Sequence, residues 1–274
     1  MRQKISKISL VLILLLTHTN FTNACTIFMA NDSKHVWIGN NEDESVNMKY
    51  RFWYFKKSKK NYGYMSWSEL HPTYESIMYQ YPQGGLNEYG LFMDYTAIDE
   101  IPVIRNFQKT DREKEVINDI LRTCKTVDEA LRYINGFNLI KLSAAQLFIG
   151  DATGDYATVH GNYIVRKTTP CFALTNYSIN NNHTQHCWRR ETAYHYLQKE
   201  KKFDLTDITQ ILSKTAQKPQ PGDDIATNYS MAIDLKKQKI YLYLKRDYTR
   251  KIVISLSKQL KKNMFFEDLG NQLK

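Results

Sequence analysis

Cys25 is the residue of this sequence best placed to do chemistry, because it directly follows an expected cleavage site. That site is Thr22-Asn23-Ala24, where small residues suit signal peptidase and the cut is expected after Ala24. A cysteine released at the N-terminus carries a thiol with a pKa of about 8.5 and an α-amine with a pKa of about 7.7–8.0. The amine can take the proton of its own thiol near neutral pH, so one residue supplies both a nucleophile and its general base.

The first 24 residues predict export. Three basic residues precede an apolar stretch over 8–16, which is too short to span a bilayer. We therefore expect a signal peptide at 1–24 and a single domain over 25–274, in a periplasmic or secreted protein without stable membrane insertion. The alternative, from a different functional class, is an envelope lipoprotein or binding module lipidated at Cys25. Thr22 argues against it, because lipoprotein signals usually have Leu at that place.

Composition and charge exclude several other classes. The 274 residues are 42% hydrophobic and 24% charged, which is typical of a folded globular protein. The net charge of +10 is spread along the chain, and its densest run, Lys56 to Lys60, is interpreted as a solvated hairpin tip. No nucleic-acid partner is expected, since no stacking-aromatic or helix-turn-helix motif accompanies that run. Only His183 and His186 lie close together, without a Cys or acidic partner at zinc spacing, so no metal is expected. Glycine-rich phosphate loops are missing too, and no cofactor is expected.

The elements that must position Cys25 alternate between strands and helices. Helices are expected after an Asp111 cap, after a capping box at Thr126-Val-Asp-Glu129, and over about 188–201 and 206–216. Strands are expected at 25–30, 35–39, 51–55, 62–67, 84–94 as a pair, 145–150, 156–160, 163–166, 171–175, 229–234, 240–244 and 252–256. The order is strands, two helices, strands, two helices, strands. It predicts an α+β fold of four αββα layers, with two antiparallel sheets between helical layers.

Five short islands, in this order, resemble the linear-amide hydrolases. They are Cys25-Thr26, Gly39-Asn-Asn-Glu-Asp43, Gly85-Leu-Asn-Glu-Tyr-Gly-Leu91, Leu174-Thr-Asn176-Tyr and Trp188-Arg-Arg-Glu. That superfamily holds choloylglycine (bile salt) hydrolases, penicillin V acylases, acid ceramidase-like amidases and relatives of the isopenicillin-N acyltransferases. The resemblance implies an N-terminal-nucleophile (Ntn) hydrolase fold and hydrolysis of a small-molecule N-acyl amide through a thioester. An acyltransferase results if an amine outcompetes water, and the sequence leaves both outcomes open.

The resemblance also assigns roles to single residues. Cys25 would be the nucleophile, Asp43 would hold the α-amine toward the thiol, and Asn176 would stabilise the oxyanion. Arg189, chosen over Arg190 by spacing, would stabilise thiolate and oxyanion charge. Each has a plain structural alternative: a buried cysteine, a turn aspartate, an Asx turn and a solvated arginine.

Some positions depart from the family pattern. Asn40 stands where many relatives have an arginine, so a charge-assisted contact to the nucleophile or to an acidic substrate is missing. Ala97 stands where choloylglycine hydrolases have an asparagine on the oxyanion side, so backbone N–H groups would serve there. Asp94 and Asn41 are the candidate substrate-binding residues. These departures count against bile-salt specificity.

The remaining cysteines suggest one disulfide. Cys171 and Cys187 bracket Asn176, and an exported protein permits a bond between them, although sequence alone leaves it open. Cys124 falls on an apolar helix face and is interpreted as packing. The oligomeric state is not predicted.

Overall fold

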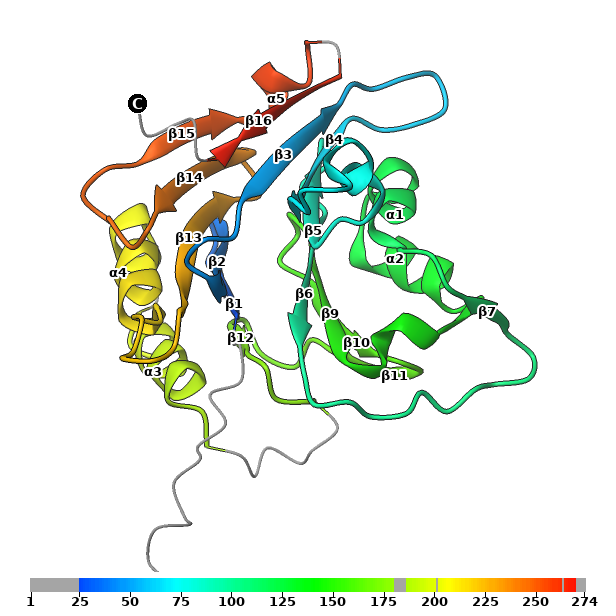
Figure 1. Ribbon diagram of the computed structural model, residues 1–274, viewed down its shortest axis with the longest axis horizontal. Coiled ribbons are helices and arrows are strands. Elements are labelled where there is room, and N and C mark those ends of the chain that lie inside the picture. Colours follow the sequence, from blue (N-terminus) through cyan, green and yellow to red (C-terminus); the bar gives the residue numbers. More distant parts are fainter. Residues whose placement is uncertain (1–24, 180–185, 201, 263, 270–274) are drawn as a thin grey trace, which may run out of the picture.

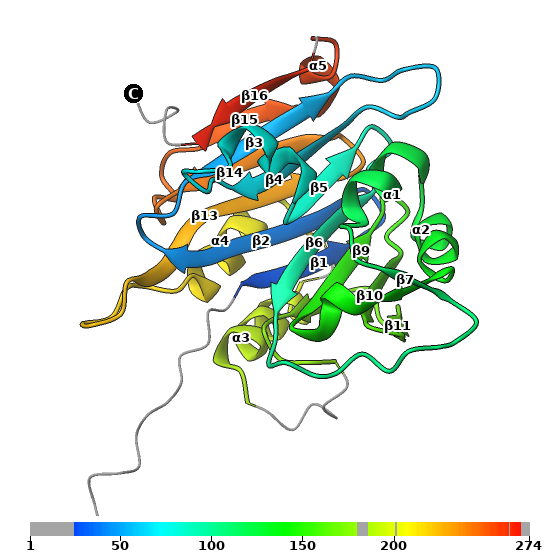
Figure 2. The ribbon, with the colours of Figure 1, turned by 45° about the vertical axis from the view of Figure 1, so that its right-hand side comes forward.

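Two antiparallel sheets dominate the computed structural model, which describes residues 25–179, 186–200, 202–262 and 264–269. The predicted signal peptide, 1–24, lies outside the described residues. The smaller sheet has the strand order β12-β1-β2-β13-β14-β15. Its strands are β1 (Thr26–Asn31), β2 (Val36–Ser45), β12 (Phe172–Leu174), β13 (Ile225–Asp234), β14 (Lys239–Leu244) and β15 (Ile252–Ser255). Figure 2 shows β1, β2 and β13 lying side by side in this order.

The larger sheet has eight strands, in the order β11-β10-β9-β6-β5-β4-β3-β16. They are β3 (Tyr50–Phe55), β4 (Tyr64–Glu69), β5 (Gly84–Asn87), β6 (Phe92–Ala97), β9 (Ala145–Gly150), β10 (Tyr156–His160), β11 (Tyr163–Arg166) and β16 (Phe265–Asp268). A short parallel pair, β7 (Thr110–Arg112) and β8 (Phe137–Leu139), stands apart.

Helices cover the outer face of each sheet, which gives four layers (Figure 1). The helices are α1 (Ile117–Thr123), α2 (Val127–Ile134), α3 (Trp188–Leu197), α4 (Leu205–Thr215) and α5 (Leu256–Gln259), with 3-10 turns η1 (Glu75–Gln80) and η2 (Ile140–Ser143). Helices α1 and α2 pack on the larger sheet, and α3 and α4 on the smaller one. The predicted αββα architecture is therefore confirmed.

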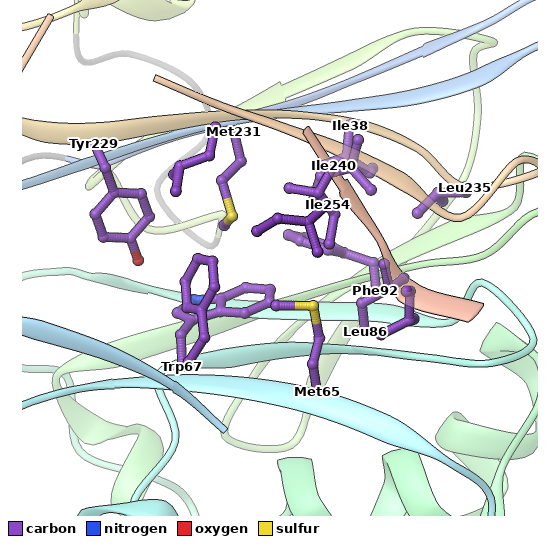
Figure 3. Close-up of a cluster of buried hydrophobic side chains, with 14 of the residues drawn as sticks. Ile38, Met65, Trp67, Leu86, Phe92, Tyr229, Met231, Leu235, Ile240 and Ile254 are labelled. Carbon is purple, nitrogen blue, oxygen red and sulfur yellow. The ribbon is translucent and has the colours of Figure 1, made fainter. Parts of the chain in front are cut away.

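The main core lies between the two sheets (Figure 3). Ile38, Met231 and Ile240 project from the smaller sheet toward Trp67 and Phe92 of the larger one. All five side chains are fully buried. Burying one large apolar side chain contributes roughly 1.5–3 kcal/mol, so this layer holds the two sheets in a fixed relation.

The helices are amphipathic where they meet the sheets. In α4, Ile208, Ile211, Leu212 and Thr215 are buried, at the i, i+3, i+4, i+7 spacing of one helix face. Asp204 caps this helix, accepting hydrogen bonds from two backbone N–H groups of the first turn. The helix is thus fixed at its start and along its inner face, against the sheet that carries Cys25.

Most predicted strands and helices are present, and one helix start is wrong. The hairpins expected near 25–39, 51–67 and 84–94 all form. Helix α1 begins at Ile117, not after Asp111. Asp111 lies in β7, where its carboxylate accepts a hydrogen bond from Asn138 at 2.9 Å. That long-range partner holds the residue in a strand, which no local pattern could reveal.

Candidate active site

Residues from both sheets line a cavity of about 270 Å³ that contains Cys25. Three residues predicted as catalytic, Cys25, Asp43 and Asn176, line it together. Ala97, at the end of β6, lines it as well. The cavity wall thus brings together the residues that carry a thiol, a carboxyl and a carboxamide, although the Asp43 carboxyl itself is bonded to Arg189 away from the cavity.

Strand pairing sets the neighbour of Cys25 on the β2 side. Thr26 opposes Asn41, so the same register continued by one residue places Cys25 opposite Glu42. The Cys25 Sγ lies 3.6 Å from Glu42 Oε1, to which the thiol donates. Burial raises the pKa of the Cys25 thiol well above its ordinary value, and the charges of Glu42 and Asp43 raise it further. The backbone N–H of Asp43 donates to the sulfur and opposes that rise. The sulfur therefore keeps its proton until a base removes it.

The pairing with β12 sets the neighbour on the other side. Ile27 opposes Leu174, so the register continued by two residues places Asn176 opposite Cys25. Gln146 holds the segment after β12, because its side-chain amide donates to the carbonyls of residues 175 and 177 at 2.8 and 3.0 Å. Nothing in the sequence points to this positioning role, since a glutamine inside a strand carries no signal of its own.

The Asn176 carboxamide is buried and free to meet a ligand. Its side chain is 6% exposed, and neither its Nδ2 nor its Oδ1 has a hydrogen-bond partner among the described residues. Leaving a buried polar group unsatisfied costs about 1–3 kcal/mol. Such a group in a cavity wall beside a nucleophile is suited to hold a carbonyl oxygen as it becomes negative.

Asp43 is held by a buried ion pair on the helical side of the smaller sheet. Its Oδ2 accepts from Arg189 Nη1 at 2.7 Å, and its Oδ1 accepts from the Thr227 hydroxyl. Gln217 Oε1 accepts from the same Arg189 nitrogen at 3.0 Å. Burial raises the pKa of Asp43 to about 7, and the Arg189 charge and the Thr227 hydrogen bond limit the rise.

Arg189 rather than Arg190 is the arginine next to the predicted site residues, as the spacing indicates. It differs from the expected role in its contacts. It does not line the cavity of Cys25, and its guanidinium is bonded to Asp43. In the described structure it therefore acts on Asp43, one residue beyond the Glu42 that faces Cys25.

The two predicted substrate-binding residues do not face this cavity. Asn41 points to the opposite side of β2, where its amide donates to the Leu212 carbonyl and Thr215 hydroxyl, both at 3.0 Å. Its carbonyl oxygen accepts from Ser230 at 2.6 Å. Side chains alternate along a strand, so Glu42 and Asn41 lie on opposite faces. Asn41 thus anchors α4, which corrects the substrate-binding role.

Asp94 lies between the sheets, outside the cavity lining. Its Oδ2 accepts from Asn40 Nδ2 at 2.5 Å, across the gap between β2 and β6. Burial raises the pKa of Asp94 well above its ordinary value. Its charge in turn raises the pKa of Glu42, which burial already raises. Asp94 therefore acts on the site through its charge, which raises the pKa of the Cys25 thiol as well as that of Glu42. No motif in the sequence pointed to Glu42.

The remaining cysteines differ in their surroundings. Cys171 and Cys187 are free thiols here, so the disulfide is not formed. Cys124 is buried among the side chains under α1 and α2, as expected for packing. Among the described residues no cluster of three or more His, Cys, Asp or Glu side chains is arranged to hold a metal. No described helix has the length and apolar character needed to cross a membrane.

Comparison with solved structures shows which known proteins share this fold. No protein-family model matches the sequence, and no curated protein matches it. Two variants of a conjugated bile acid hydrolase from Clostridium perfringens superpose with a TM-score of 0.65, at 15% and 14% identity, over 89% of this chain and 96% of theirs. A penicillin V acylase from Agrobacterium tumefaciens superposes with a TM-score of 0.61 at 15% identity, over 89% of this chain and 91% of its own. The resemblance noted in the sequence motifs is thus matched in three dimensions. This chain has the αββα fold of the N-terminal-nucleophile hydrolases.

Proposed function

We propose that this protein is an exported amidase that hydrolyses a linear carbon–nitrogen bond of an N-acyl substrate, with Cys25 as N-terminal nucleophile. The observation that carries the proposal is the convergence of the Cys25 thiol and the unpartnered Asn176 carboxamide on one cavity. The bile acid hydrolase and penicillin V acylase that share the fold make amide hydrolysis the favoured reaction class.

The chemistry follows from these two groups and the α-amine that cleavage after Ala24 would free. The amine takes the thiol proton as Cys25 Sγ attacks the amide carbonyl, which becomes a tetrahedral oxyanion. Asn176 Nδ2 donates to that oxygen. The intermediate collapses, the C–N bond breaks, and the α-ammonium returns the proton to the leaving amine. Water then attacks the thioester. One of its protons passes through the α-amine to the sulfur, and the carboxylic acid that forms releases the other, which gives a carboxylate and the free thiol.

Asp43 and Arg189 set the electrostatics of the centre. Asp43 lines the cavity and its backbone N–H donates to the sulfur, while its carboxyl is paired with Arg189 on the helical side of the sheet. The Arg189 cation favours the ionised form of this carboxyl. An ionised Asp43 would favour a protonated α-amine nearby and so support the step in which that amine carries the proton.

The test begins with the full-length gene expressed in an exporting host. An intact mass and N-terminal peptide spectrum should show Cys25 as a free first residue. The purified protein should then hydrolyse at least one of a panel of N-acyl amides: penicillin V, a glycine-conjugated bile salt, and acyl-aminocoumarins. Cys25→Ala should abolish turnover, and Cys124→Ala, which removes another buried thiol, should retain it.

Two results would count against the proposal. A lipid attached to Cys25 would occupy the sulfur, so the thiol could no longer act as the nucleophile. That result would favour a membrane-tethered binding protein. Full turnover by a chain that keeps a residue before Cys25 would show that the α-amine is not the base, because that nitrogen would then be an amide.

A further inference from the structure

The cavity that contains Cys25 is acidic, although the protein as a whole is basic. The chain carries a net charge of +10. Five acidic residues line the cavity, together with one basic residue, Lys141. The carboxyls are Glu42, Asp43, Glu44, Glu69 and Glu115. A cavity lined by one sign of charge attracts ligands of the opposite sign, so this lining favours a cationic occupant.

Two of the five carboxyls have a cation from the protein. Arg189 pairs with Asp43 at 2.7 Å. Burial raises the pKa of Glu115, and the Lys141 charge, together with a hydrogen bond from Tyr95, opposes that rise. The negative charges of these two carboxyls are therefore offset by Arg189 and Lys141.

The other three carboxyls, those of Glu42, Glu44 and Glu69, have no basic partner among the described residues. Within the described part of the chain, no lysine, arginine or histidine nitrogen comes within 4.0 Å of the carboxylates of Glu42, Glu44 or Glu69. Burial raises the pKa of Glu69, and the charge of Glu44 raises it further. The three carboxyls thus repel one another, and a positive group among them would relieve the repulsion.

Two other residues of the cavity wall have buried polar atoms without a hydrogen-bond partner among the described residues. The buried Asn176 carboxamide has no partner on either polar atom. Gln83 donates to Glu69 at 2.6 Å, and its buried Oε1 has no partner among the described residues. No described group of His, Cys, Asp and Glu residues is arranged to hold a metal, so an organic cation is the fitting occupant.

We propose that the cavity selects a cationic N-acyl substrate, whose ammonium or guanidinium group is held by Glu42, Glu44 and Glu69 while its amide carbonyl lies at Cys25. The inference rests on the proposed function for the placement of the carbonyl. A processed α-ammonium on Cys25 would balance only one of three uncompensated carboxyls, so room for a second cation remains. Anionic N-acyl compounds are disfavoured by the same charges.

The experiment measures binding, so it does not depend on turnover. The Cys25→Ala protein, expressed from the full-length gene in an exporting host, is titrated calorimetrically with three amides of similar length. They are 6-aminohexanamide, heptanamide and adipamate, which end in an ammonium, a methyl and a carboxylate group. The ammonium ligand should bind at least about tenfold more tightly than the methyl ligand, and the carboxylate ligand more weakly than either.

Second substitutions locate the charge that discriminates. Glu69→Gln or Glu44→Gln, added to Cys25→Ala, should reduce the ammonium-to-methyl affinity ratio at least about threefold. Glu100→Gln is the matched control: it removes the same charge from an exposed residue outside the cavity and should leave the ratio unchanged. Two separate acidic variants keep the test valid if one of them fails to fold.

The outcomes separate this inference from the proposed function. Equal, weaker or undetectable binding of the ammonium ligand overturns the cationic preference, and so does a Glu69→Gln effect no larger than that of Glu100→Gln. Either result leaves the Cys25 amidase standing if Cys25→Ala still abolishes hydrolysis. Retained hydrolysis in Cys25→Ala overturns the amidase proposal, whatever the binding ratio.

Discussion

Replacing Arg189 with methionine should destabilise the protein strongly, because it removes one member of a buried ion pair. Arg189 Nη1 lies 2.7 Å from Asp43 Oδ2, and the two side chains are 7% and 0% exposed. Breaking such a pair from one side leaves a buried charge without its counter-ion, at a cost of about 3–5 kcal/mol. Methionine keeps much of the length and apolar stem of arginine, so the decrease in the free energy of unfolding comes mainly from the lost charge.

The cost should depend on pH in a direction that the Asp43 pKa fixes. Burial raises that pKa from its ordinary 3.8 to about 7, against the pull of Arg189. Between these values the folded state holds a proton that the unfolded state has lost, so stability falls as pH rises through this window. Above about pH 7 the wild type has released the proton and the fall ends. In Arg189→Met the pKa is higher still, so the fall continues.

The stability difference between the two proteins should therefore widen above pH 7, by up to about 1.4 kcal/mol per pH unit. Urea unfolding followed by tryptophan fluorescence at pH 6, 7 and 8 measures it. Arg190→Met is the control, because the described structure gives Arg190 no ion pair, and it should change stability by no more than about 0.5 kcal/mol. Adding Asp43→Asn to Arg189→Met should remove the pH dependence. A difference that stays constant across this range would refute the reasoning about Asp43.

Three further substitutions test other parts of the site. Asn176→Ala should lower kcat by about 10²–10³ with little change in KM, measured on whichever amide the wild type hydrolyses; an unchanged kcat would remove Asn176 from the oxyanion site. Glu42→Gln should lower the pKa of the Cys25 thiol, seen as a lower midpoint in the pH dependence of its alkylation by iodoacetamide, since the Glu42 charge raises that pKa. An upward shift would contradict this assignment. Gly39→Ala should cost about 1–3 kcal/mol in urea unfolding, because the new methyl overlaps the buried ring of Phe28, and Phe28→Leu should recover part of the loss.

Local sequence patterns predicted correctly those strands and helices that are determined by residues close together in the sequence. The β1–β2 hairpin follows from apolar strands flanking an Asn31-Asp-Ser-Lys turn, and the start of α2 from Thr126, whose hydroxyl accepts from the Glu129 backbone N–H at 3.3 Å. The edge strand β16 was missed. It is fixed by contacts far apart in sequence, including the stacking of Phe265 on Tyr54 with ring centroids 4.4 Å apart. No window along the sequence contains both partners.

The directions of side chains on β2 were harder to predict than the strand itself. Ile38 faces the core between the sheets, while Trp37 faces the helices, and both are buried. A strand buried on both sides has apolar residues on both, so its pattern does not tell which face is which. For that reason Asn41 could be expected in the cavity, whereas Glu42, one residue later, is the side chain that meets Cys25.

The geometry around Cys25 depends on the register of three neighbouring strands. In the smaller sheet β1 lies between β12 and β2. Cys25, the residue just before β1, therefore has a neighbour on each side. Both registers are antiparallel, and continuing them places Asn176 on one side of Cys25 and Glu42 on the other. A slip of one residue in either pair would turn the alternate side chain toward the thiol. It would exchange Glu42 for Asn41 or Asp43, and the carboxamide of Asn176 for the side chain of Thr175 or Tyr177. The packing of Ile27 and Leu174 between the sheets, and of Phe28 and Ala173 against the helices, holds these registers and therefore also fixes the chemistry at Cys25.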